Sequence, residues 1–483
     1  MSKHRLLLIV SAVSFVIALA PIASAADYYV DADRGDDRAD GTVTHPVQTI
    51  TRGLALVGPG ETLHLASRSA PYRESIEVVN RSGEIERPII IDGHGATLTG
   101  AEDLRVAEWH NDGDGRYHNA ELWKRLRGKS KSLNLMFLLD RVFFRIGGRV
   151  QRMGRMSKGP QVAMKNSADL NVGEWSFTTG DETFHLRIEP DKQLGDAGIE
   201  FPIRESGVRI RGTCSDLVIR NVTVTHFWND GFNIHNNCRR IRFENISAIE
   251  NGDDGFSAHE TCEVDVEGLR SQGNSTGVCN VNQSQCRMTN CRLGDNLAFE
   301  FFGCDGTSFH VTNMLVEAKR SLRPFVVLGN RKTGENCTIQ LDNVQIVRPS
   351  DLKGQFEVAA NGQLSATRIT SIGLDWMVDG KTEIRNSLLI CPRLGSQIKI
   401  RDAQTWVSQN NEYQFSTSSV ADQTWRQSSF NDFLLAINDK SSRPAQHTQF
   451  DIGKLIDGTL ARGTVGGAVL SEMRLPPGET PSE

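Results

Sequence analysis

Two acidic turns, 24 residues apart, carry the residues best suited to chemistry. The first reads WNDGF and contains Asp230, and the second reads NGDDGF and contains Asp253 and Asp254. His235 returns as His259 at the same interval. Neighbouring carboxylates can divide the acid and base roles of a hydrolytic reaction, or they can hold a hard cation such as Ca²⁺. Asn-Gly and Asp-Gly pairs are also ordinary turn sequences, so a purely structural role has to be weighed beside both.

A repeat of 22 to 24 residues surrounds these turns. Its segments alternate apolar and polar residues and read LVIRNVTV, IRFENISA, VDVEGLRS, RMTNCRLG and FHVTNMLV. Three short strands in each repeat, with polar turns between them, predict a right-handed parallel β-helix. One position of each segment is asparagine or glycine, which tolerate left-handed turns, and asparagine amides can bond from coil to coil. The members of this expected ladder are Asn221, Asn245, Gly268, Asn290 and Asn313, followed by Asn343 and Asn386.

The repeat predicts which acidic residues meet. Residues one coil apart lie at the spacing of neighbouring strands, about 4.8 Å, so Asp230 is expected to stack on Asp254 with Asp253 beside them. Two carboxylates about 5 Å apart repel by roughly 3 kcal/mol at an effective dielectric constant of about 20. A shared proton, a bound Ca²⁺ or a basic side chain from a loop would offset this repulsion. These aspartates are therefore candidate catalytic residues and candidate calcium ligands.

The two histidines form a second expected stack. If Phe232 and Phe256 point inward, alternation points His235 and His259 outward. An extended strand places each histidine roughly 16 Å from the aspartate of its own coil, so no His–Asp couple is expected within one coil. Stacked imidazoles can bind a transition metal, hydrogen-bond sugar hydroxyls or simply face solvent. Glu300, in LAFEFFG two coils further on, is expected to line the same outer face, where it would suit sugar binding.

Four of the nine cysteines also recur every 24 residues, and they are Cys214, Cys238, Cys262 and Cys286. Stacked positions fall within the Cα separation of about 4.4–6.8 Å that disulfides need, so Cys214–Cys238 and Cys262–Cys286 bridges can form after export. Buried free thiols would serve equally as small apolar residues. The sequence leaves both alternatives open. It offers no histidine partner that would make Cys279 a nucleophile.

The N-terminal segment, 1–25, has the organisation of a secretory signal peptide. A basic start over positions 3–5 precedes a nearly apolar stretch over 6–20, and Ala23-Ser24-Ala25 supplies small residues for cleavage. No other apolar run is long enough to span a bilayer, so we expect a secreted or periplasmic monomer with no membrane segment after cleavage. A formal net charge of −5 gives no electrostatic reason to expect a nucleic-acid partner.

The N-terminal stretch of the mature chain carries a family resemblance. It reads YYVDADRGDDRADGTVTHPVQTITRGLALVGPGETLHLA and is followed by RPIIIDGHGATLTG. These segments resemble the opening of secreted right-handed β-helix proteins of the pectate-lyase-like superfamily. The resemblance covers residues 27–100 and 200–345, and it implies a short amphipathic helix over about 49–57 that caps the first coil.

The stretch between these two regions interrupts the repeat. VAEWHNDGDGRYH, NLMFLLDRVFFRIG and GEWSFTTGDETFHLRI predict β-hairpins, and thus a small inserted β-sandwich. Similar insertions occur in β-helix glycoside hydrolases of the β-xylosidase type. The predicted order is a signal peptide (1–25), a cap with the first coils (26–104), the insertion (105–200), the main coils (201–402), C-terminal coils with a cap (403–474) and a disordered tail (475–483).

Two groups of the superfamily indicate what the acidic turns could do. In calcium-dependent pectate lyases, aspartates stacked in a similar GDDG context hold Ca²⁺ and a lysine of the next coil acts as base. By this resemblance Asp230, Asp253 and Asp254 would be calcium ligands, but Cys279 stands at the position of the lysine. In polygalacturonases, aspartates of an NTDG-like turn and a DD turn hydrolyse the substrate, and WNDGF and NGDDGF resemble both turns. The later GHG and RIK elements of that group are not found, and STG stands in place of the first.

The sequence thus predicts an all-β chain, a right-handed parallel β-helix with an inserted β-sandwich, that binds polysaccharide on its outer face. The first hypothesis is an enzyme that cleaves the polysaccharide by hydrolysis or by cation-assisted β-elimination. Its catalytic candidates are Asp230, Asp253, Asp254, His235, His259 and Glu300. The second hypothesis is a non-catalytic glycan-binding protein that kept the scaffold. Function resides in the site rather than in the fold, so the sequence leaves this choice open.

Overall fold

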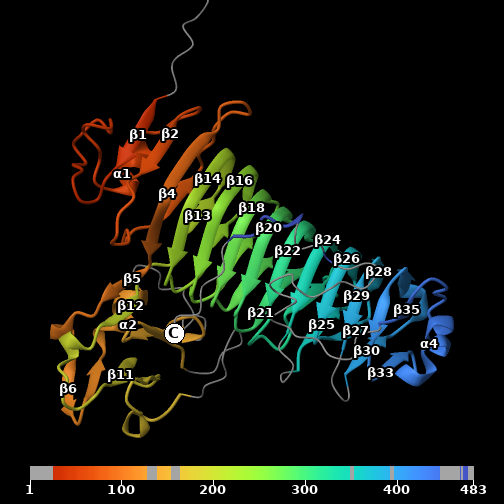
Figure 1. The fold of residues 1–483 in the computed structure, drawn as a ribbon. Helices are drawn as coiled ribbons and strands as arrows, with labels where there is room; N and C mark the ends of the chain where they lie inside the picture. Colours follow the sequence, from red (N-terminus) through yellow and green to blue (C-terminus); the bar gives the residue numbers. More distant parts are fainter. Residues whose placement is uncertain are drawn as a thin grey trace, which may run out of the picture.

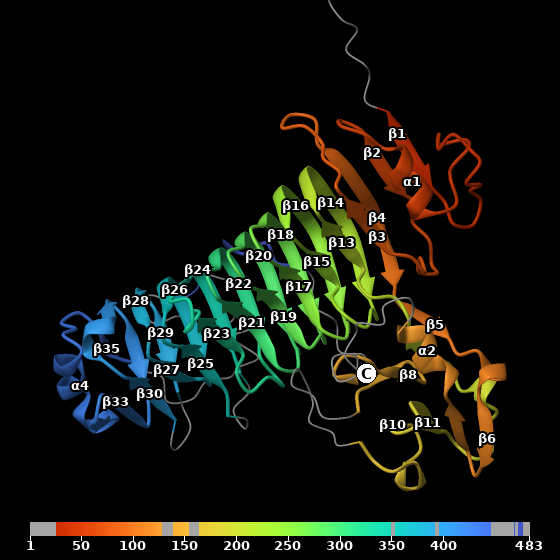
Figure 2. The same cartoon turned by 180° about the vertical axis from the view of Figure 1, so that it is seen from behind.

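The structure is a computed structural model that describes residues 26–127, 139–153, 164–348, 353–391, 396–445, 468 and 472–476. The expected signal peptide (1–25) and positions 477–483 of the expected tail lie outside the described residues. The chain forms a right-handed parallel β-helix whose coils stack along one axis, with a separate β-rich insertion beside the first coils (Figures 1 and 2). The predicted fold class is confirmed.

One side of the coil is a 15-stranded sheet, parallel in every ladder. Its strands are β1 (Asp27–Val30), β2 (Thr62–Leu65), β4 (Ile89–Thr99), β14 (Thr213–Thr225), β16 (Asn237–Ile249), β18 (Glu263–Gln272), β20 (Gln285–Gly294), β22 (Ser308–Glu317), β24 (Cys337–Val347), β26 (Gly362–Ile372), β28 (Lys381–Arg385), β29 (Leu388–Ile390), β31 (Trp406–Gln409), β32 (Glu412–Gln414) and β35 (Arg443–Pro444).

The other side is a 12-stranded sheet. Its strands are β3 (Ile76–Val79), β13 (Val208–Arg211), β15 (Phe232–Ile234), β17 (Asp254–Ala258), β19 (Thr276–Asn280), β21 (Phe299–Cys304), β23 (Phe325–Leu328), β25 (Gln355–Val358), β27 (Asp375–Val378), β30 (Gln397–Ile400), β33 (Thr417–Val420) and β34 (Gln423–Arg426). Only the last pair, β33 with β34, is antiparallel among the described strands of this sheet.

The predicted asparagine ladder marks the bend of each long strand. Asn221 lies inside β14 and Asn245 inside β16, so two of the three strands expected in each coil are one strand bent at the asparagine. All seven predicted positions have positive φ, between 49° and 76°. The Nδ2 atom of Asn245 donates to Oδ1 of Asn221 at 2.9 Å, and Asn313 donates to Asn290 at 3.1 Å. Gly268 interrupts the ladder, and Asn290 bonds Glu267 there instead.

Inward side chains stack in register to form the core of the coil. Phe232 lies opposite Phe256 in neighbouring strands, as the repeat predicts. Further along, Phe325 and Phe356 stack with ring centroids 4.6 Å apart, and Trp376 stacks on Phe356 at 4.0 Å. This continuous buried column holds successive coils at a fixed height, which fixes the position of the side chains on the outer face.

The cysteine ladder is shorter than predicted. Cys214 and Cys238 are register partners, and Cys262 contacts Cys238. The predicted Cys262–Cys286 stack is wrong, because the register between β18 and β20 places Cys286 opposite Val264. All nine cysteines are free thiols.

Helices close the described part of the coil at both ends. The predicted cap is confirmed as α1 (Ile50–Leu56), whose N-cap Thr49 accepts a hydrogen bond from Arg52 N. At the other end lies α4 (Phe430–Ala436), next to the last strands (Figure 1). Its Phe430 and Phe433 belong to the hydrophobic core of the coil. Short 3₁₀ turns lie at Val106–Glu108, Ser167–Asp169, Leu194–Asp196, Ala403–Thr405 and Gln427–Ser429. No helix in the described part of the chain has the length and apolar character that a membrane span needs.

The insertion contains two four-stranded antiparallel sheets. One has the order β10 (Trp175–Thr178), β11 (Thr183–Arg187), β7 (Arg116–Asn119) and β6 (His110–Gly113). The other has the order β5 (Ala101–Asp103), β12 (Ile199–Pro202), β8 (Phe144–Ile146) and β9 (Arg149–Gln151). The helix α2 (Glu121–Arg127) packs against β11 of the first sheet. Aromatic residues such as Trp123, Phe144 and Trp175 give the insertion a hydrophobic core of its own. That core includes Trp228 of the coil, so the two parts are packed together.

Candidate active site

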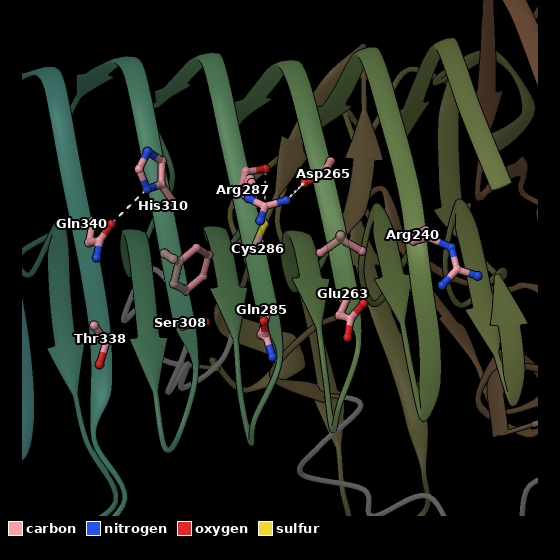
Figure 3. Close-up of a pocket in the computed structure, with 12 residues that line it drawn as sticks. Arg240, Glu263, Asp265, Gln285, Cys286, Arg287, Ser308, His310, Thr338 and Gln340 are labelled. Carbon is pink, nitrogen blue, oxygen red and sulfur yellow. Dashed lines mark hydrogen bonds and ion pairs between the residues drawn. The ribbon is translucent and has the colours of Figure 1, made fainter. Parts of the chain in front are cut away.

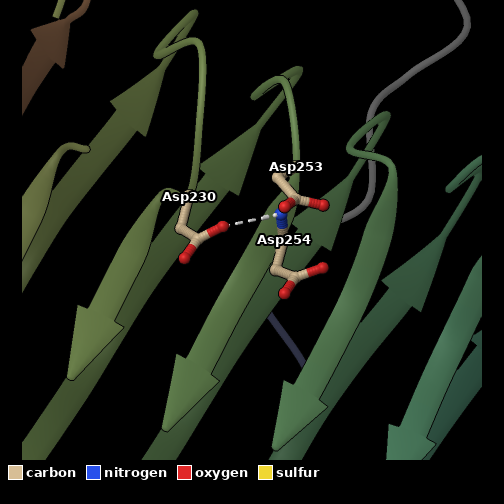
Figure 4. Close-up of side chains that lie close together, drawn as sticks. All are labelled: Asp230, Asp253 and Asp254. Atoms are coloured by element: carbon tan, nitrogen blue, oxygen red, sulfur yellow. Dashed lines mark hydrogen bonds between the residues drawn. The ribbon is translucent and has the colours of Figure 1, made fainter. Parts of the chain in front are cut away.

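The two acidic turns meet as the repeat predicts. The Asp254 backbone N–H donates to Oδ1 of Asp230 at 3.0 Å, which confirms that these residues stack across adjacent coils (Figure 4). Asp230, Asp253 and Asp254, called the acid trio below, each offer one carboxylate oxygen, and these oxygens lie within 4.8 Å of one another. All three residues are buried, with exposed fractions of 3% to 4%. The trio therefore concentrates negative charge where water screens it poorly.

Close approach of the coils explains the glycines of both turns. A Cβ atom on Gly231 would come 2.7 Å from the carbonyl oxygen of Gly255. One on Gly255 would come 2.1 Å from Oγ of Ser271, inside the coil. Glycine is thus required by packing at this position, as the structural interpretation of the turns expects. Packing accounts for the glycines but gives no reason for three adjacent aspartates.

A basic side chain from the insertion offsets the repulsion within the trio. Nε of Arg141 lies 2.6 Å from Oδ2 of Asp253, and the two side chains are 9% and 5% exposed. The sequence left open a shared proton, a bound Ca²⁺ or a basic side chain from a loop as the means of offsetting this repulsion, and Arg141 is such a basic side chain. A buried guanidinium at this distance favours the ionised form of the Asp253 carboxylate.

Asp230 is held by three donors. Its Oδ1 accepts from Asp254 N at 3.0 Å, and its Oδ2 accepts from Ser257 Oγ at 2.9 Å and from Asn233 Nδ2. Asn233 and Ser257 are opposite each other on β15 and β17 and point to the outer face, as alternation predicts. These bonds fix the orientation of the carboxylate before any ligand arrives.

The acid trio lies in a cleft of about 460 Å³. The cleft is lined by Arg141, Glu205, Arg209, Arg211, Asn229, Asp230, Asn233, His235, Asn236, Asp253, Asp254, His259, Cys279 and Val281. It thus brings together side chains from the insertion and from β13, β15, β17 and β19. Five of the six predicted catalytic candidates line it, and Glu300 does not.

The predicted histidine stack is confirmed. The rings of His235 and His259 lie 3.9 Å apart between centroids with an interplanar angle of 15°. Nδ1 of His235 is 3.3 Å from Oε2 of Glu260, which also accepts from the backbone N–H of Asn236 at 2.7 Å. The stack presents a planar polar surface in the same cleft as the trio. Such a surface suits contact with sugar hydroxyls or with the face of a sugar ring.

Glu300 does not lie on the outer face, so this prediction is wrong. Glu300 is fully buried. Its Oε2 accepts a hydrogen bond from Asn296 Nδ2 at 2.6 Å, and its Oε1 accepts one from Ser321 Oγ at 3.2 Å. The register explains the error, because Glu300 lies opposite Gly277. A side chain at Gly277, or at Gly255 one coil earlier, would point into the coil. Burial raises the pKa of Glu300 to about 8.

A pair of arginines at the edge of the cleft was missed by sequence reasoning. Arg209 and Arg211 alternate outward on β13. Nη1 of Arg209 lies 3.0 Å from Oε2 of Glu205, and Nη2 of Arg211 lies 3.2 Å from Oε1 of Glu77. The alternation in VRIR could have identified both as outward residues. Nothing in the sequence indicates that Arg141 reaches Asp253, because their contact joins the insertion to the coil.

A second depression, of about 340 Å³, lies on the outer face of the 15-stranded sheet (Figure 3). Its polar side chains form in-register rows, in which Asp265, Arg287, His310 and Gln340 follow one another on β18, β20, β22 and β24. Nη1 of Arg287 lies 3.6 Å from Oδ1 of Asp265, and Nδ1 of His310 lies 3.0 Å from Oε1 of Gln340. Acidic and basic groups here offset one another on an open surface. The depression has none of the buried carboxylate stacking found in the first cleft.

The ligand types of the acid trio fit a hard cation. Within the described residues the trio is the one group of three metal-binding side chains close enough to share an ion, and Ca²⁺ takes carboxylate oxygens. If Ca²⁺ binds, Asp230, Asp253 and Asp254 would hold it, and it would supply positive charge toward an acidic sugar. Arg141 already supplies a positive charge to the same group.

Comparison with known proteins agrees with this architecture. The family model for the right handed beta helix region matches residues 206–348. XylC, solved in complex with xylose, shares a TM-score of 0.54 at 10% identity, over 88% of this chain and 86% of that one. A glycoside hydrolase matches with a TM-score of 0.48 at 11% identity, over 93% and 100% of the two chains, and the pectate lyase Pel9A with 0.33 at 15%, over 71% and 80%. No curated protein sequence matches the chain.

These findings define the class of protein by its fold. The chain has the right-handed parallel β-helix fold.

Proposed function

We propose that the protein is an exported carbohydrate-active enzyme that hydrolyses glycosidic bonds of a polysaccharide at the acid trio. The observation that carries the proposal is the convergence of three buried carboxylates from adjacent coils in an open cleft, with Arg141 2.6 Å from Asp253. Burying three carboxylates together is costly, so such a cluster in a cleft is a candidate active site. The likeness of the fold to that of XylC agrees with this proposal.

Glycoside hydrolysis needs one carboxyl group that donates a proton and one carboxylate that activates water or attacks the sugar. We assign the ionised role to Asp253, because the guanidinium of Arg141 stabilises its negative charge. Asp254 supplies the proton, because the three hydrogen bonds that Asp230 accepts favour its ionised form, and a protonated Asp254 avoids a third negative charge in this buried group. The proton passes to the oxygen of the leaving sugar, and the carboxylate of Asp253 accepts one from the attacking water.

The remaining lining residues of the cleft position the substrate in this proposal. The His235–His259 stack offers ring nitrogens and a flat face to one sugar, and Asn233 orients Asp230 while contacting the cleft. Arg209 and Arg211 line the cleft along β13, where they would contact neighbouring sugars of the polysaccharide. The cleft is open to the surface, so a polymer could extend beyond it.

The proposal is tested by incubating the protein with polygalacturonate, alginate, xylan and β-glucan, with and without Ca²⁺. New reducing ends without ultraviolet absorbance of unsaturated products are expected on one of them, and Asp254→Asn should abolish them. Asp265→Asn, which removes an exposed carboxylate from the opposite sheet, is the matched control and should leave the rate unchanged. Unsaturated products would replace hydrolysis with β-elimination. No product from any polymer, with glycan binding retained in Asp254→Asn, would favour the non-catalytic glycan-binding protein.

Calcium binding by the acid trio is a second proposal, favoured by the mutual approach of its oxygens within 4.8 Å. Calorimetric titration with Ca²⁺ tests it on the unmodified protein and on Asp254→Asn. Loss of a binding event in the variant is expected if the trio holds the ion. Equal heats from both proteins would exclude the calcium site. Arg141 would then be the positive charge that offsets the repulsion within the trio.

A further inference from the structure

A second arginine of the insertion reaches the turn that carries two members of the acid trio. Nη2 of Arg152 donates to the carbonyl oxygen of Asn251 at 2.6 Å and to that of Gly273 at 3.2 Å, and Nη1 donates to that of Gly252 at 3.2 Å. Asn251 and Gly252 directly precede Asp253, and Gly273 lies at the equivalent turn of the next coil. One guanidinium therefore ties together the backbones of two successive coils.

The environment of Arg152 makes this contact rigid. Its guanidinium lies over the ring of Phe143, 5.0 Å from the centroid. Burial lowers the pKa of Arg152 to about 10, against the attraction of Glu250. A planar guanidinium offers several donors in fixed directions, which suits three carbonyl groups at once, whereas a lysine ammonium does not hold that geometry. The group remains charged at neutral pH and has its hydrogen bonds directed at the turn.

The insertion also contacts the other side of the same turn. A Cβ atom on Gly252 would come 2.0 Å from the carbonyl oxygen of Trp228 and 2.4 Å from that of Arg141. The backbone of Gly252 thus lies between the segment around Arg141 and the side chain of Arg152. Its N–H donates to Phe227 O at 2.7 Å, and that of Asp253 donates to Asn229 O at 2.9 Å.

We propose that Arg152 is a positioning residue of the active site, and that the insertion holds the Asp253–Asp254 turn in its working geometry through this side chain. The proposal rests on the proposed hydrolytic function for its kinetic consequence. A displacement of about 1 Å in a catalytic group can reduce a rate on the order of 100-fold, so a loosened turn should slow chemistry more than it weakens binding. Arg141 contacts the reacting carboxylate, whereas Arg152 acts only through the backbone of the turn.

The test compares Arg152→Met and Arg152→Lys with Arg187→Met. Arg187 is a matched control, because it also lies in the insertion and donates to a backbone carbonyl, that of Leu170 at 2.8 Å, away from the cleft. With the polysaccharide that the unmodified enzyme cleaves, Arg152→Met should lower kcat at least tenfold and change KM less than twofold. Arg152→Lys should recover only part of the rate, and Arg187→Met should retain all of it. Hydrogen–deuterium exchange should rise at Gly252 and Asp253 in Arg152→Met while the amides of β24 stay protected.

Each outcome decides the inference. A rate loss in Arg152→Met that only follows the loss of folded protein, or an equal loss in Arg187→Met, would overturn it. If the unmodified protein cleaves no polymer, the proposed function fails, and exchange at the turn still decides the structural part. Unchanged exchange at Gly252 and Asp253 in Arg152→Met would then show that the side chain does not hold the turn.

Discussion

Arg141 and Asp253 are 112 residues apart in the sequence and 2.6 Å apart in space. The contact joins the insertion to the coil and places a positive charge against the acidic cluster. The first prediction is that Arg141→Met lowers kcat on the order of 100-fold, because Asp253 loses the charge that keeps it ionised. Steady-state kinetics of the unmodified enzyme and the variant measure this effect.

A double-mutant cycle separates this role from general damage to the fold. The double variant of Arg141→Met with Asp253→Asn should be no slower than Asp253→Asn alone, because interacting residues are not additive. Arg116→Met, which removes an insertion arginine that pairs with Asp114 and does not line the cleft, should have little effect. Simple additivity of the two losses would mean that Arg141 and Asp253 act independently.

A second prediction concerns pH and the buried Glu300. Its pKa is about 8 in the folded chain, raised by burial from the ordinary 4.5. Between these values the unfolded chain loses a proton that the folded chain keeps, so the free energy of unfolding falls as pH rises from about 4.5 to 8. Glu300→Gln keeps a neutral group beside Asn296 and Ser321 and removes this dependence. The variant should be more stable at pH 7, by on the order of 3 kcal/mol.

Urea unfolding at pH 5, 7 and 8 measures this difference. The gain from Glu300→Gln should be small at pH 5 and grow toward pH 8, while Glu86→Gln, at an exposed position, should change nothing. The rate of cleavage should stay close to that of the unmodified enzyme, because Glu300 is not part of the cleft. A stability difference that is independent of pH would show that Glu300 is already ionised in the folded chain.

The sequence predicts the position of a site residue only where the coil repeat and the strand alternation both hold at that residue. Asp230 and Asp254 follow the longer coil repeat, so their stacking is predicted from spacing alone. Glu300 and its neighbour Phe301 are both buried, because Glu300 lies in the row of Gly255 and Gly277, where strand alternation does not hold. Cys286 is misplaced for a different reason, since the register between its coil and the preceding one pairs it with Val264 rather than with Cys262.

Contacts between the insertion and the coil could not be predicted at all. The positions of Arg141 and Arg152 depend on how a non-repeating module packs beside the repeat, and no interval in the sequence encodes that packing. The segment containing Arg141 reads as an ordinary β-hairpin, with Asp140 and Arg141 near its turn. The sequence did predict that the acidic cluster needs compensation, because the repulsion follows from the stacking itself.

A third prediction concerns the histidine stack. His235→Ala and His259→Ala should each raise KM about tenfold with kcat changed less than threefold, because removal of a binding contact shared by ground state and transition state acts on KM. His310→Ala, on the opposite sheet, is the control and should leave both parameters unchanged. A fall in kcat at constant KM would instead assign the histidines to proton transfer.

A fourth prediction concerns the asparagine ladder that keeps the coils in register. Asn245 has φ of 49° and donates to Asn221 at 2.9 Å. Asn245→Gly keeps the left-handed conformation and loses the amide bond, which should lower the free energy of unfolding by about 1 kcal/mol. Asn245→Ala loses the bond and also strains the backbone, so its loss should be larger by about 1–2 kcal/mol. Ser247→Ala on the same strand is the control in urea unfolding, and equal losses in the glycine and alanine variants would mean that the backbone conformation contributes nothing to the ladder.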